Sequence, residues 1–177
     1  MASLIPSGSA SGTGSMTLSA PVTNSNQTAT LPDATGTVMV SGNMPTFNAG
    51  MSGNQTITNS STTLLQFNQT SWDTSSAFNT STYAYTPKVA GYYQINGAVY
   101  TGGSSNSFIS LFLNGNAYLR GEQVTGSGNN LVFNGLVYCN GSTDYLQLYL
   151  TNNNGSSITT SNYSFTTQFS GVLARTA

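Results

Sequence analysis

Alternation of apolar and polar side chains, with a period of two residues, is the feature that most constrains the fold of this chain. Within residues 91–100, Tyr93, Ile95 and Val99 would point one way and the residues between them the other. Successive side chains of a β-strand point to opposite faces of a sheet, so this pattern predicts a long strand. The same alternation returns in residues 163–174. The chain is therefore predicted to be all-β.

Short apolar runs separated by turn residues extend this pattern along the chain. Asn114-Gly115 is a strong hairpin signal, because a type I′ turn needs a positive φ at both central residues. Residues 152–155 form a second predicted turn, and residues 68–77 are predicted to be a loop. Strands are predicted over residues 62–67, 91–100, 108–114, 117–120, 131–138, 145–151 and 163–174.

One predicted strand is apolar on both of its faces. Leu146, Leu148 and Leu150 would point one way, and Tyr145 and Tyr149 the other. In a single antiparallel sandwich one face of each sheet meets water and should be polar. The pattern therefore predicts a second buried surface, between copies of the chain.

Charged side chains make up 4% of the residues, against about 25% in a typical domain. With a net charge of −1 and no basic cluster, neither nucleic acid nor anionic lipid is an expected partner. Few ionic contacts should make stability vary little with salt or between mild pH values. Low charge with many Thr, Asn, Ser and Gly residues is typical of virus fibre and decoration proteins.

The sequence offers little catalytic chemistry. The chain has no histidine and one cysteine, which excludes a Ser-His-Asp triad, a Cys-His pair and a zinc site. Cys139 is expected to be a small apolar residue on a strand. Asp73, Glu122 and Asp144 could formally supply a carboxylate pair for glycoside hydrolysis, but nothing in the sequence pairs them. No enzymatic activity, metal or cofactor is predicted.

Two residues of the predicted loop 68–77 have candidate roles. Trp72 could stack on a sugar and is the candidate ligand residue, with a place in the core as the alternative. Asp73 is expected to cap the loop rather than to bind a ligand.

The N-terminal quarter differs in composition from the rest. Residues 1–15 form a predicted flexible arm of Ser, Gly and Ala, and residues 16–44 a short β attachment region. Residues 41–50 are predicted to be a linker, with a boundary at Met44-Pro45 and a knob over 45–177. The candidate attachment residues are the larger apolar side chains of this region: Leu4, Ile5, Leu18, Val22 and Leu31.

No run approaches the roughly 18 apolar residues of a membrane span, and the start of the sequence lacks the features of a signal peptide. About 25 residues cannot bury a core alone, so the attachment region must pack on other copies or on a host structure.

A set of spaced residues gives a resemblance to a known family. They are Phe67, Asp73, Phe78, Tyr85, Gly91, Tyr93 and Ile95. Their spacing resembles the signature of the complement-type globular head, a ten-stranded jelly roll related to the tumour necrosis factor trimers. Tyr85 and Ile95 stand where that family has Phe, and Gly97 where it has a further aromatic residue. Residues 111–115 and 169–173 also resemble the family's mid-chain hairpin and closing strand.

The resemblance implies an antiparallel jelly-roll knob that forms a homotrimer. The second buried surface would then be the three-fold axis, with Tyr93, Phe112, Tyr145 and Tyr149 as candidate interface residues. A tyrosine suits such a place because its ring packs while its hydroxyl finds a partner. Some members of the family bind calcium near this axis, but the four acidic residues here are scattered.

Residues 28–38 resemble a repeat element common in phage tail-fibre and virion proteins. The expected function is therefore a non-enzymatic bacteriophage virion protein, anchored through its N-terminal region to the major capsid protein or another virion component. It would serve as a capsid decoration, cement or head-fibre protein. Three alternatives remain: a short tail fibre that binds a host receptor or glycan, a lectin-like binding module, and a depolymerising enzyme.

Overall fold

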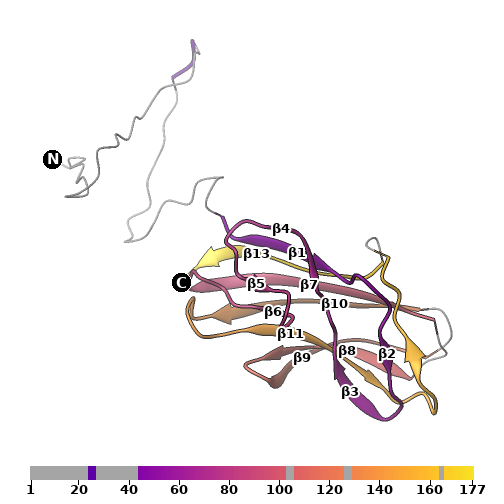
Figure 1. Ribbon diagram of the computed structural model, residues 1–177. Coiled ribbons are helices and arrows are strands. Elements are labelled where there is room, and N and C mark those ends of the chain that lie inside the picture. Colours follow the sequence, from indigo (N-terminus) through magenta and orange to yellow (C-terminus); the bar gives the residue numbers. More distant parts are fainter. Residues whose placement is uncertain (1–23, 27–43, 103–105, 126–128, 164–165) are drawn as a thin grey trace. The chain divides into compact units, whose positions relative to one another are not determined.

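The computed structural model describes residues 24–26, 44–102, 106–125, 129–163 and 166–177. These residues form thirteen strands and no helix (Figure 1). The strands are β1 (Thr46–Gly50), β2 (Thr56–Ile57), β3 (Ser61–Leu64), β4 (Gln69–Asp73), β5 (Phe78–Asn79), β6 (Ala84–Tyr85), β7 (Gly91–Thr101), β8 (Ser107–Leu113), β9 (Asn116–Val124), β10 (Asn129–Cys139), β11 (Leu146–Asn152), β12 (Ile158–Thr159) and β13 (Gln168–Thr176).

The strands form two main antiparallel sheets that pack face to face (Figure 1). The five-stranded sheet has the order β10-β7-β13-β1-β4. The six-stranded sheet has the order β5-β6-β11-β8-β9, and its sixth strand, β3, pairs with β11. Strands β2 and β12 form a small separate pair. The predicted all-β antiparallel class is confirmed.

Contacts along the chain divide it into Met1–Thr37 and Val38–Ala177, and all thirteen strands belong to the second unit. The predicted boundary at 44/45 stays a prediction. The predicted arm, most of the attachment region and its candidate residues Leu4, Ile5, Leu18, Val22 and Leu31 lie outside the described residues.

Aromatic rings fill the space between the sheets. Phe47 stacks on Tyr85 with ring centroids 4.0 Å apart, and its edge meets Phe169 at 5.0 Å. Phe67 packs against the other side of this cluster, 5.6 Å from Phe169. All four side chains are fully buried. Burial of a large apolar side chain stabilises a fold by about 1.5–3 kcal/mol, so this cluster is a main source of stability.

Most of the spaced residues that carry the family resemblance are buried in the core of this sandwich. Tyr85, Tyr93 and Ile95 have no exposed surface. Gly91 is needed because a Cβ there would lie 2.3 Å from the backbone oxygen of Arg175. A Cβ at Gly97 would lie 2.5 Å from Leu148 Cδ1, so Leu148 takes the room that the family's usual aromatic side chain would occupy.

Several local predictions are confirmed. Burial alternates along β7, with Tyr93, Ile95 and Val99 inward. Asn114 and Gly115 have φ values of 54° and 77°, as a type I′ hairpin turn requires. The carboxylate of Asp73 accepts hydrogen bonds from the backbone N–H groups of Phe78, at 2.7 Å, and of Ser75, at 3.3 Å, so it caps the following loop as expected.

Three local predictions are wrong. Residues 46–50, predicted to be part of a linker, form β1, which pairs with both β13 and β4. β1 has only five residues, and so short a segment shows too few alternating positions to be recognised as a strand. Trp72 lies on β4 rather than in a loop. The closing strand begins at Gln168, so Tyr163 precedes it in a loop.

Candidate functional site

The outer surface of the five-stranded sheet carries a group of exposed apolar side chains. Their exposed fractions lie between 38 and 53%. We call this group the aromatic face: Trp72, Tyr92, Val132, Leu136, Tyr138 and Val172. Exposed apolar groups on one surface mark sites of protein association, because a soluble monomer rarely keeps a large contiguous apolar patch.

Strand register brings most of this group together. Tyr92 on β7 lies opposite Tyr138 on β10, and their rings meet edge to face with centroids 5.5 Å apart. Gln94 pairs with Leu136 on one side and with Val172 on the other. The aromatic face therefore runs from β10 across β7 to β13.

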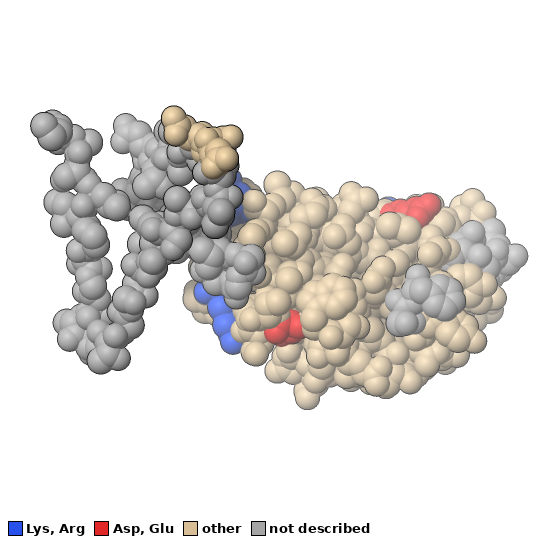
Figure 2. Space-filling model, turned by 90° about the horizontal axis from the view of Figure 1, so that it is seen from above, with Lys and Arg blue, Asp and Glu red and all other residues tan. Residues whose placement is uncertain are grey.

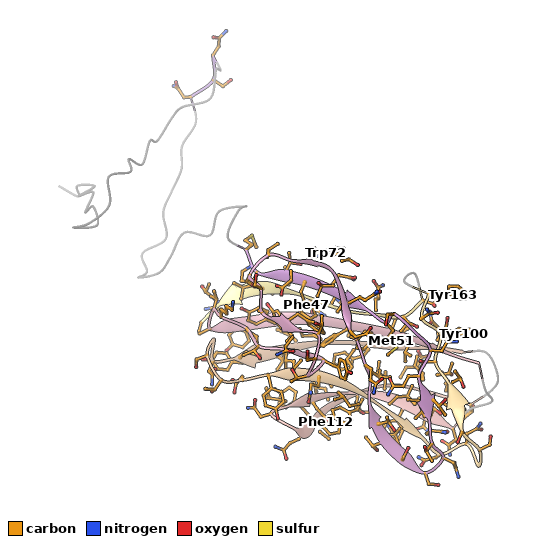
Figure 3. The ribbon with its side chains drawn as sticks, in the orientation of Figure 1. Phe47, Met51, Trp72, Tyr100, Phe112 and Tyr163 are labelled. Carbon is orange, nitrogen blue, oxygen red and sulfur yellow. The ribbon has the colours of Figure 1, made fainter. Side chains whose placement is uncertain are left out.

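Trp72 continues this surface at the opposite edge of the sheet. Thr46 on β1 lies opposite Val172, and the Trp72 indole N–H donates to the Thr46 hydroxyl at 3.4 Å. In Figure 3, Trp72 lies on the outside of β4, whereas Phe47 lies between the sheets. The surface thus reaches all five strands, with polar Gln94 and Thr46 between the apolar residues.

A row of polar residues crosses the same sheet surface next to Gln94. The cross-strand neighbours there are Ser170, Asn96 and Asn134. Close to them, the Asn48 side-chain amide donates to Gln168 Oε1 at 3.0 Å. This polar row separates Val132, which lies opposite Ala98 on β7, from Leu136 and Tyr138.

Three aromatic rings of the six-stranded sheet are covered from within the chain. Phe112 and Tyr149 stack with centroids 3.9 Å apart and ring planes 26° from parallel. The Arg120 guanidinium lies 3.7 Å from the centre of the Phe108 ring, a cation–π contact. Burial raises the pKa of Tyr149, in keeping with its half-buried ring. Each of these rings is covered on one side by a neighbour.

Of the four residues predicted to line the interface, Tyr93 lies in the core instead. Its side chain has no exposed surface, and its hydroxyl donates to the Val89 backbone oxygen at 2.8 Å. Burial also raises the pKa of Tyr93 to about 12. A side chain that its own chain encloses has no exposed surface with which to contact a second copy.

The other three predicted interface residues share the six-stranded sheet region. Phe112 and Tyr149 lie in contact on β8 and β11, and Tyr145 immediately precedes β11. In Figure 3, Phe112 lies on the side of the sandwich away from Trp72. These residues form one cluster, separate from the aromatic face. Their place in an interface stays a prediction, and the aromatic face is the alternative surface for association.

The aromatic face was missed, although the sequence held a signal for it. Along β10, Leu131, Phe133 and Val137 are buried, whereas the alternating Val132 and Leu136 are exposed. This strand is therefore apolar on both faces, as β11 is. The two-sided pattern identifies the strand, but it does not say which sheet will leave its outer side chains uncovered.

The described residues show little catalytic potential. They contain no group of three or more His, Cys, Asp or Glu side chains that could hold a metal ion. The Glu122 carboxylate accepts from the Val132 N–H at 3.3 Å, and that of Asp144 from the Asn140 N–H at 2.8 Å. Cys139 is fully buried, and burial raises the pKa of its thiol to about 12. A thiol with such a pKa is not a nucleophile near neutral pH.

Charge is sparse on the face shown in Figure 2, where blue and red atoms form small separate areas in a largely uncharged surface. No helix within the part of the chain that the structure describes could cross a membrane.

Comparison with known proteins identifies the fold. No family model and no curated protein matches the sequence. Among solved structures, the Eiger tumour necrosis factor of S. frugiperda superposes with a TM-score of 0.58 at 12% identity, over 76% of this chain and 93% of that one. The globular domain of zebrafish complement 1qA gives 0.53 at 17% identity, over 76% and 99%.

A viral structure also matches. The vertex protein P5 of phage PRD1 superposes with a TM-score of 0.53 at 14% identity, over 74% of this chain and 97% of that one. At these identities the similarity concerns the fold alone. The chain has the antiparallel jelly-roll fold of the tumour necrosis factor and complement 1q domains.

Proposed function

We propose that this chain is a non-enzymatic structural protein of a bacteriophage virion and that it assembles as a homotrimer on the particle surface. The observation that carries this proposal is the aromatic face, which leaves uncovered apolar side chains on one sheet of a tumour necrosis factor-like jelly roll. The likeness to the vertex protein of a phage supports the virion as the location.

Apolar side chains continue around the edge of the sandwich, which favours a ring. Leu119 on β9 is exposed, and a Cβ at Gly135 on β10 would lie 3.0 Å from its Cδ1. Gly135 faces inward beside Phe133, so Leu119 lies at the edge between β9 and β10, next to the aromatic face rather than on it. If this edge of one copy packs on the aromatic face of the next, the contact is head to tail, and such contacts form a closed ring when the rotation between copies closes.

The N-terminal unit would provide the anchor. Residues 1–44 precede the sandwich, and residues 28–38 resemble an element of phage fibre and virion proteins. In this proposal the region binds the major capsid protein or another virion component, and the knob projects outward as a decoration, cement or head-fibre protein. The fibre-like element also supports the alternative of a short tail fibre that binds a host receptor.

Copy number in purified particles tests the location. Gel densitometry against the major capsid protein should give one copy per capsid subunit or a simple fraction of it. A few trimers per particle would support the tail fibre instead, and absence from particles would contradict the proposal. A chain of residues 45–177 should remain trimeric but no longer attach, so retained attachment would place the anchor in the knob.

A further inference from the structure

A polar cleft of about 790 Å³ lies beside β4, and its lining shares no residue with the aromatic face. The lining has no charged side chain. It combines amides, hydroxyls and one exposed aromatic ring, and the residues that matter most are Met51, Asn68, Gln69, Ser71, Asn162 and Tyr163. Binding sites for small molecules are concave surfaces of this size with a few polar groups that fix the orientation of the ligand.

A β-bulge shapes one wall of the cleft. On β4, Trp72 pairs with Asn48 and Thr70 pairs with Ala49, so Ser71 is an extra residue without a partner on β1. Such bulges occur at sheet edges and redirect side chains, and β4 is an edge strand. The bulge also interrupts the regular edge that a peptide strand would need for pairing.

Two asparagine side chains are held in place by the segment that follows β1. Asn68 Oδ1 accepts from the Ser52 N–H at 2.8 Å, and its amide donates to the Ser52 hydroxyl at 2.8 Å. The Asn162 N–H donates to Asn54 Oδ1 at 3.0 Å, and its side-chain amide donates to the Ser52 backbone oxygen at 3.3 Å. Both side chains therefore have fixed orientations before any ligand binds.

Other polar groups of the cleft are available for a ligand. The Gln69 amide and the Thr80 hydroxyl have no hydrogen-bond partner among the described residues. Both residues are exposed. Together with the bulged Ser71, they offer donors and acceptors along one side of the cleft.

Tyr163 supplies an aromatic surface at the rim. Its side chain is 64% exposed, more than any other large apolar side chain that the structure describes. Its backbone oxygen accepts from the N–H groups of Thr166 and Thr167, both at 2.9 Å, and from the Thr166 hydroxyl at 3.1 Å. These bonds fix the loop backbone at the rim of the cleft. Met51, almost fully buried, adds an apolar contribution to the lining.

We propose that this cleft binds a neutral oligosaccharide. Sugar rings present hydroxyls that need both donors and acceptors, and the amides and hydroxyls of the cleft supply both. Their C–H faces pack on aromatic rings, and Tyr163 offers one. The absence of charge in the lining disfavours phosphate- or carboxylate-bearing ligands, which would lose water without gaining a partner. The cleft belongs to a single chain, so this proposal goes beyond the proposed assembly and does not depend on it.

Binding of the full chain to an array of neutral oligosaccharides tests the proposal. The array holds glucose, galactose, mannose and N-acetylglucosamine oligomers, with sialylated and sulfated glycans as charged counterparts, and titration calorimetry gives affinities. We expect binding to at least one neutral series. Tyr163→Ala should weaken it at least tenfold, and Tyr163→Phe, which keeps the ring, should retain most of it. Gln69→Ala should weaken it severalfold.

Tyr118→Ala is the matched control, because Tyr118 is a similarly exposed tyrosine on β9 that does not line the cleft. It should bind as the wild-type chain does. Three results would overturn the proposal: binding to no neutral oligosaccharide, binding to charged glycans alone, or equal affinity in the Tyr163→Ala variant. Light scattering on each variant separates a loss of sugar binding from a failure of assembly.

Discussion

Apart from the exposed Tyr118 on β9, the two sheets differ in how their outer aromatic residues are covered. On the six-stranded sheet, Phe112 stacks on Tyr149, and Phe108 lies under the Arg120 guanidinium. On the five-stranded sheet, Tyr92 and Tyr138 touch only edge to face, and both remain exposed. Ring–ring stacking and cation–π contacts cover apolar surface within one chain. The five-stranded sheet lacks that cover, and a second copy of the chain would supply it.

This comparison shows that an apolar outer face does not by itself mark an interface. Both sheets have strands that are apolar on two sides, β10 in one and β11 in the other. They differ in whether side chains of the same chain cover the outward side of the strand.

Leu148→Asp should have the largest effect, because it changes the inward side of β11. Leu148 is fully buried and packs over Gly97 of the opposite sheet. An unpaired buried carboxylate costs several kcal/mol, a large part of the about 5–15 kcal/mol that stabilises a domain. We expect an unfolded or aggregated chain by circular dichroism. A folded variant with a native denaturation midpoint would show that this side of β11 is not core.

The inward side of the five-stranded sheet should make the fold sensitive to alkali. Burial raises the pKa of Tyr93 and that of the Cys139 thiol, each to about 12. Both groups are neutral in the folded chain and lose their protons at lower pH when the chain unfolds. Their contribution is fully present below about pH 9 and falls as pH rises towards 12, by about 1.4 kcal/mol per pKa unit for each group.

Urea denaturation between pH 7 and pH 12 measures this loss. Tyr93→Phe should flatten the decline above pH 10, at the cost of the hydrogen bond to the Val89 oxygen, about 1 kcal/mol at pH 7. An unchanged alkaline decline in Tyr93→Phe would show that Tyr93 does not titrate with unfolding.

The stacked pair on the six-stranded sheet should give the smallest effect. A double-mutant cycle with Phe112→Ala and Tyr149→Ala should yield a coupling energy of about 0.5–1.5 kcal/mol within one chain. The oligomeric state should not change in either variant. A coupling energy that depends on protein concentration would instead mean that the pair contributes to an interface.

Sequence alone predicted the fold because the spacing of core residues is visible without coordinates. Phe67, Tyr85 and Ile95, whose spacing carries the family resemblance, are buried in the sandwich. The Asn114-Gly115 turn was predictable because few dipeptides accept two positive φ values.

The candidate site was less predictable, because it depends on which strands become neighbours. Tyr93 could be placed on a face of β7 by alternation, but only the sheet order shows that this face is the core. Leu136 and Val172, from distant parts of the chain, flank the same residue, Gln94. The cleft depends on the unpaired Ser71, and no local pattern signals a single extra residue in a short edge strand.

The most direct test of the central claim is the oligomeric state of two matched variants, Leu136→Asp and Tyr149→Asp, by multi-angle light scattering. Both place a carboxylate on an outer sheet surface, one on the aromatic face and one on the covered face. The account predicts a trimeric wild-type chain, a folded monomer for Leu136→Asp and a trimer for Tyr149→Asp. A trimeric Leu136→Asp together with a monomeric Tyr149→Asp would place the interface on the six-stranded sheet, and a monomeric wild-type chain would contradict the trimer itself.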